Sequence, residues 1–87
     1  MAMRQDLDTG SGPQNLANAI ITQAAKDWRT AAAYLRAHPN GTGKRFWAAE
    51  KTKKECEAFF LSDWYTELTD LDGEYLLNRL KKEAGEL

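Results

Sequence analysis

The segment Asp70–Glu74 has the alternating acidic residues and the glycine that are typical of a calcium-binding EF-hand loop. In that loop the glycine occupies the sixth position, and the first and twelfth positions supply carboxylates. Placing Gly73 sixth puts Leu68 first and Arg79 twelfth, and neither side chain binds calcium. The segment is therefore predicted to begin a helix rather than to hold a metal, with one of three residues as its N-cap: Thr69, Asp70 or Asp72.

Cys56 and His38 are the chain's single cysteine and single histidine, too few for the four protein ligands of a structural zinc site. A nucleophilic pair would need an exposed thiol of low pKa. Cys56 instead falls on an apolar stripe between Ala49 and Phe60, which predicts a buried side chain. We therefore expect no catalytic residue, no metal and no cofactor, and a protein that is not an enzyme.

The glycines of the segment 40–44 suggest a phosphate-binding loop only faintly, since their spacing differs from that motif and no strand precedes them. Turn formation accounts for them fully, because Pro39 disfavours helical geometry at His38 and the glycines supply turn conformations.

A tryptophan beside basic residues is the strongest binding signal in the chain. Trp47 lies off the apolar stripe of its predicted helix, and Trp, Tyr and Arg are the side chains that most often anchor protein interfaces. The same residues could instead place positive charge and an aromatic ring against nucleic-acid phosphates. The candidate partner-binding residues are Trp47, Lys44, Arg45, Lys51 and Tyr34.

Apolar residues at three- and four-residue spacing predict the helices that position these side chains. We expect main helices over 14–37, 44–61 and 72–84, a short helical turn at 63–69 and no strand. Ser62 either caps this turn or marks a bend at which the second helix continues into it. The stripe of the first helix comprises Ala17, Ile20, Ile21, Ala24, Trp28, Ala31, Ala32 and Leu35. The predicted core comprises Leu16, Ile20, Ala24, Trp28, Leu35, Phe46, Cys56, Phe60, Trp64, Leu68, Leu71, Leu76 and Leu80. Lys53 falls within the apolar stripe of its helix, where it either reaches solvent or pairs with Asp27.

The 87 residues are typical of one domain: a disordered polar tail over 1–13 and a single helical domain over 14–87. A core of this size is marginal, which leaves self-association as a homodimer open. The unpaired cysteine, the polar first residues and the absence of a long apolar run predict a cytoplasmic protein with no membrane segment.

Charge is divided unevenly along the chain. Residues 15–54 contain eight basic and two acidic side chains, whereas residues 55–87 contain three basic and nine acidic ones. We interpret the division mainly as attraction between the two halves of a folded bundle, with a partner-binding basic face as the alternative.

Three segments together resemble small uncharacterised helical proteins carried by prophages and integrative elements of Gram-positive bacteria: 19–29, 57–64 and 68–76. The resemblance covers most of residues 15–83, and the loop 40–45 and the N-terminal tail lie outside it. It implies a cytoplasmic accessory protein of a mobile element, and it brings no established activity.

The sequence thus predicts an all-α fold, a small bundle of three main helices plus a short helical turn. The predicted function is a non-enzymatic protein-interaction module, whose partner is another protein or a second copy of the chain. The alternative is a DNA- or RNA-binding accessory protein that uses the basic start of the second helix.

Overall fold

The computed structural model describes residues 13–86 and is all-α over that range. Four helices follow one another: α2 (Pro13–Ala37), α3 (Lys44–Phe60), α4 (Asp63–Leu68) and α5 (Gly73–Glu83). All four were predicted, and their ends fall within about one residue of the expected ones. The predicted disordered tail lies outside the described residues except for Pro13, which begins α2 instead of ending the tail.

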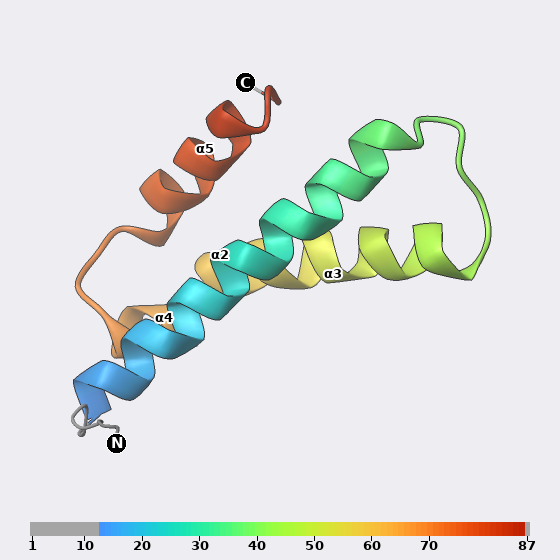
Figure 1. The fold of residues 1–87 in the computed structure, drawn as a ribbon. Coiled ribbons are helices and arrows are strands. Elements are labelled where there is room, and N and C mark those ends of the chain that lie inside the picture. The colour runs from blue at the N-terminus through green and yellow to red at the C-terminus, as the bar shows by residue number, and fades with distance from the viewer. Residues whose placement is uncertain (1–12, 87) are drawn as a thin grey trace, which may run out of the picture.

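The helices α2 and α3 form a hairpin whose two arms pack against each other, and the loop that joins them bulges to one side (Figure 1). The short α4 lies near the N-terminal end of α2, and α5 then returns in roughly the same direction as α2 (Figure 1). The hairpin is therefore covered by α4 and α5, with the shared core between them.

Local hydrogen bonds explain where the helices begin. Ser62 caps α4, because its hydroxyl oxygen accepts from the Tyr65 amide at 3.2 Å and its hydroxyl donates to the Phe59 carbonyl at 2.7 Å. Of the three residues proposed to cap the last helix, Asp72 is the one that does so. Its Oδ1 accepts from the amides of Glu74 at 2.9 Å and Tyr75 at 3.3 Å.

The core lies where α2 crosses α3 and where Tyr65 and α5 close over them. Trp28, Tyr65, Phe60 and Leu80 are its largest fully buried side chains. Among residues 15–86, the buried hydrophobic residues are Ala17, Ile21, Trp28, Ala31, Ala32, Cys56, Phe60, Tyr65, Leu77 and Leu80.

Three residues assigned to the core are exposed instead: Leu16 at 63%, Trp64 at 55% and Leu71 at 68%. Successive helical residues point about 100° apart, so the burial of Ala17 and of Tyr65 turns Leu16 and Trp64 away from the core. Leu71 lies in the connection before α5, outside any helix. The other assigned residues are buried (Trp28, Cys56, Phe60, Leu80) or half-buried (Ile20, Ala24, Leu35, Phe46, Leu68, Leu76).

Lys53 does not pair with Asp27, which was its proposed partner. Its ammonium group lies 3.5 Å from Glu57 Oε2 and 3.1 Å from Glu86 Oε1, and it sits 5.5 Å from the centre of the Trp28 ring. Glu57 and Glu86 together neutralise the Lys53 ammonium group at the edge of the core, so it does not need the Asp27 carboxylate as a partner. Asp27 accepts instead from Gln23 on its own helix.

The start of α5 lies against the end of α3 without an intervening side chain. Gly73 is buried, and a Cβ atom there would overlap the Phe60 carbonyl oxygen and lie 3.0 Å from Tyr65 Cδ1. Glycine is therefore required by close backbone approach at this position.

Candidate functional site

The outer face of α3 carries three of the predicted binding residues. Since a helix turns once in about 3.6 residues, Lys44, Trp47 and Lys51 lie on one side of α3, and all three are exposed. We call this surface, defined by those three residues, the Trp47 face. The Trp47 indole is 61% exposed, so it is available for contact with another molecule.

The Trp47 ring contacts the ring of the preceding residue, Phe46. The two rings meet edge to face, with centroids 5.8 Å apart. Phe46 is half-buried against the loop, because a Cβ atom on Gly41 would lie 2.7 Å from Phe46 Cδ2. The indole therefore contacts a ring that itself packs against the loop between α2 and α3.

The other two predicted binding residues, Arg45 and Tyr34, lie on a different surface. Both line a hollow of about 290 Å³ between α2 and α3. The Tyr34 ring stacks on His38 with centroids 4.2 Å apart, and His38 Nδ1 lies 2.8 Å from the Tyr34 carbonyl oxygen. The five predicted residues are thus divided between the Trp47 face and the hollow.

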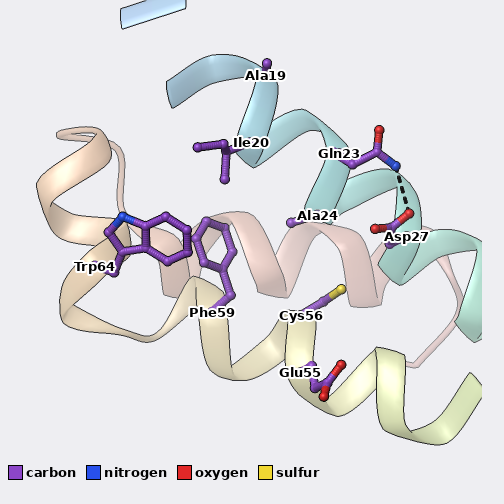
Figure 2. Close-up of a pocket in the computed structure, with 9 residues that line it drawn as sticks. All are labelled: Ala19, Ile20, Gln23, Ala24, Asp27, Glu55, Cys56, Phe59 and Trp64. Atoms are coloured by element: carbon purple, nitrogen blue, oxygen red, sulfur yellow. Dashed lines mark hydrogen bonds between the residues drawn. The ribbon is translucent and has the colours of Figure 1, made fainter. Parts of the chain in front are cut away.

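A second, larger hollow was not predicted. It measures about 470 Å³ and lies where α2, α3 and α4 meet (Figure 2). We call it the apolar groove, and its lining residues are Ala19, Ile20, Gln23, Ala24, Asp27, Glu55, Cys56, Phe59 and Trp64.

Aromatic rings form one end of the apolar groove. Figure 2 shows Trp64 and Phe59 side by side, with Ile20 above them. The two rings meet edge to face, with centroids 5.4 Å apart. Phe59 also contacts the buried Tyr65 ring at 5.6 Å, which connects this wall to the core.

Two carboxylates mark the other end of the apolar groove, one on each wall (Figure 2). Asp27 on α2 accepts a hydrogen bond from Gln23 Nε2 at 2.8 Å, and Glu55 lies opposite on α3. Within residues 13–86, no lysine or arginine forms an ion pair with either carboxylate. This end of the groove therefore has uncompensated negative charge.

The Cys56 thiol lies between the two walls of the groove and is buried. Burial raises its pKa above the ordinary value of 9.0, and Asp27, Glu55 and Glu57 raise it further. The burial predicted for Cys56 is confirmed, and the raised pKa keeps the thiol protonated at neutral pH. A protonated thiol is a poor nucleophile.

The sequence motifs that suggested chemistry have structural roles where the structure describes them. Asp72 caps α5, and His38 is held against Tyr34. The described residues contain no cluster of three or more His, Cys, Asp or Glu side chains that could hold a metal ion.

Comparisons with known proteins found no matching family model, no matching curated protein and no matching solved structure. None of the helices in the described part of the chain is both long enough and apolar enough to cross a membrane.

The apolar groove was missed because four of its nine lining residues were assigned to the core: Ile20, Ala24, Cys56 and Trp64. Two signals in the sequence pointed to it. Ile20 and Ile21 are adjacent, so both cannot face the same core, and Trp64 and Tyr65 pose the same problem in α4. In each pair the second residue is the more buried, and the first borders the groove.

Proposed function

We propose that this chain is a non-enzymatic protein-interaction module whose Trp47 face binds an acidic protein surface. The observation that carries the proposal is the exposed Trp47 indole with Lys44 and Lys51 about one turn away on either side. A large aromatic side chain surrounded by charged residues is a common arrangement at the centre of protein interfaces. The lysines select an acidic partner because complementary charge guides association.

The resemblance to proteins of prophages and integrative elements supports a cellular context for this activity. We propose that the chain is a cytoplasmic accessory protein of a mobile element, and that its partner is a protein of the host or of the element. That context favours binding over catalysis by analogy alone.

Nucleic-acid binding is the second candidate, and the same lysines favour it. Lys54 extends the Trp47 face by one further turn, so three ammonium groups could follow a phosphate backbone. Glu50 and Glu55 are interspersed with these lysines on α3 and oppose phosphate binding. Arg45 faces the hollow beside Tyr34 and is not part of this row.

Affinity capture separates the two candidates. The tagged chain is incubated with a Gram-positive lysate, with and without nuclease, at low and high salt. Three variants are run in parallel: Trp47→Ala, the double variant Lys44→Glu/Lys51→Glu, and Tyr75→Ala as a control at another exposed aromatic residue, on α5.

The proposal predicts a captured protein that survives nuclease, is lost with Trp47→Ala and with Lys44→Glu/Lys51→Glu, and is retained by Tyr75→Ala. Capture that disappears with nuclease and declines steeply with salt would move nucleic acid into first place, because phosphate contacts release counterions. If Trp47→Ala leaves the capture of every bound species unchanged, both assignments of this face are contradicted.

A further inference from the structure

The apolar groove continues along α2 into the neighbouring hollow. It borders α2 from Ala19 to Asp27, and Asp27 also lines the hollow that continues to Tyr34. At about 1.5 Å per helical step, the fifteen steps of α2 from Ala19 to Tyr34 extend over roughly 22 Å. A trough of this length accommodates a helix of about four turns.

The floor of this trough consists of small side chains. Ala24 and Cys56 lie in the apolar groove, and Ala31 and Ala49 continue the floor in the neighbouring hollow. Large side chains stand at the ends: Ile20, Phe59 and Trp64 at one end, and Tyr34 at the other. Helices pack about 8–10 Å apart when the side chains between them are small enough, so the trough favours a helix over an extended strand.

The charge of the trough selects the kind of helix. Its centre carries the carboxylates Asp27 and Glu55, and Arg45 lies at the end that Tyr34 lines. Burial raises the pKa of the Cys56 thiol on the floor, and the two carboxylates raise it further. A lysine or arginine on the bound helix would neutralise these carboxylates. An acidic side chain there would add a further negative charge close to two others.

The described part of this chain has no spare helix to fill the trough. The apolar stripes of α2 and α3 meet each other, and α5 directs Leu77 and Leu80 into the core. The remaining exposed apolar residues, such as Leu71 and Tyr75, are scattered over different segments. A second copy would therefore offer no unpartnered amphipathic helix from its residues 13–86.

We propose that the trough between α2 and α3 binds an amphipathic helix of a partner protein, with apolar residues against Ile20, Phe59 and Trp64 and a lysine or arginine between Asp27 and Glu55. This mode is helix-in-groove recognition, in which anchors at positions i, i+3 or i+4, and i+7 enter an apolar groove. The site is separate from the Trp47 face and has the opposite charge preference, so it does not depend on the function proposed above.

The test is a selection from a phage-displayed library of 18-residue alanine-based helices, randomised on one face, against the folded chain. We expect enriched sequences with apolar residues at i, i+4 and i+7 and a lysine or arginine near the middle of the helix. Synthetic peptides from the selection should bind Trp64→Ala at least tenfold more weakly and should bind Trp47→Ala as they bind the parent chain. A selection that yields no such sequence, or peptides insensitive to Trp64→Ala, would overturn the proposal.

Two further measurements locate the peptide independently of any loss of folding. The double variant Asp27→Lys/Glu55→Lys, which alters exposed positions, should reverse the preference and favour peptides with glutamate in place of the basic residue. Because Cys56, the single thiol, is buried and lines the groove, it should react slowly with a disulfide reagent in the absence of denaturant, and bound peptide should slow this reaction further. An unchanged charge preference, or an unprotected thiol at saturating peptide, would contradict binding in the trough.

Discussion

The indole Nε1 of Trp28 donates a hydrogen bond to Glu57 Oε2 at 3.0 Å, and this bond connects the fully buried tryptophan of α2 to α3. The same carboxylate oxygen lies 3.5 Å from the Lys53 ammonium group. That ammonium group also forms an ion pair with Glu86, which follows α5. One carboxylate thus connects the hairpin to the C-terminal segment. It also gives the only polar atom of the Trp28 ring its partner.

Replacing Glu57 by leucine should therefore destabilise the fold by about 1–3 kcal/mol, because a buried indole N–H would lose its acceptor. Glu57→Gln is the matched control, since its amide oxygen can still accept and the cost should be smaller. Urea unfolding followed by circular dichroism gives both values. Equal losses for the two variants would show that charge, rather than the hydrogen bond, is what matters.

The exposed pair Arg29–Glu83 should contribute far less. Its atoms lie 3.2 Å apart, but the two side chains are 56% and 52% exposed, so water screens their attraction. Arg29→Ala should change the free energy of unfolding by less than about 1 kcal/mol. A larger loss would mean that α5 depends on this ion pair to stay docked on α2.

Gly73→Ala should destabilise the protein by about 1–3 kcal/mol, the usual cost of forcing extra atoms into a packed region. The new methyl group would overlap the Phe60 carbonyl oxygen, which belongs to the backbone and cannot rotate away. Glu74→Ala, at an exposed position in the same turn, should remain within about 0.5 kcal/mol of the parent. Thermal unfolding of the two variants side by side checks the expectation, and a neutral Gly73→Ala would show that α5 can shift.

Tyr65→Phe should raise the free energy of unfolding by about 1 kcal/mol at neutral pH, because a buried hydroxyl without a partner costs about that much or more. Tyr65 is fully buried, and no residue within the described range hydrogen-bonds its hydroxyl group. The two edge-to-face contacts of the Tyr65 ring, with Phe59 and Phe60, involve only the ring and should persist. A loss of stability on urea unfolding would instead indicate that the hydroxyl has a partner, such as a bound water.

Alkaline pH should weaken the fold through the same residue and through Cys56. Burial raises the pKa of Tyr65 above 10.0, with Asp72 as a smaller cause, and the pKa of Cys56 is raised above 9.0. Both groups hold their proton more tightly when folded, so their contribution is complete below about pH 9 and is lost as pH rises through the folded-state pKa values. The double variant Tyr65→Phe/Cys56→Ala should lose less stability than the parent between pH 8 and pH 11 in urea titrations. Parallel pH profiles would contradict this linkage.

The helices were predictable because their ends are determined locally. Ser62 and Asp72 cap the helices that follow them, and Pro39 with the neighbouring glycines ends α2, so short-range chemistry alone located these boundaries. Side-chain burial was harder to predict. The choice between Ile20 and Ile21, or between Leu76 and Leu77, depends on the angle at which a distant helix approaches, and no local signal encodes that angle.

The candidate sites were also predictable where they depend on one helix and unpredictable where they depend on how helices pack. Exposure of Trp47 was predictable, because it lies opposite the stripe that ends in Cys56 and Phe60. Tyr34 and Arg45 were predicted to bind a partner, as Trp47 was, but the crossing of α2 and α3 places them in a hollow on another side. The apolar groove requires three helices to meet, so it exists only in the assembled structure.

The contact between Gly73 and the Phe60 carbonyl has a consequence for sequence divergence among relatives. The sequence just before this contact can vary, since Asp70 and Leu71 are exposed. The loop from Pro39 to Gly43 can vary too, because it is distant from Gly73 in the sequence. Gly73 cannot vary without moving two helices, and Asp72 immediately before it caps α5. An Asp-Gly pair about twelve residues after a Phe-Phe pair is therefore a compact sequence signature by which distant relatives of this fold can be sought.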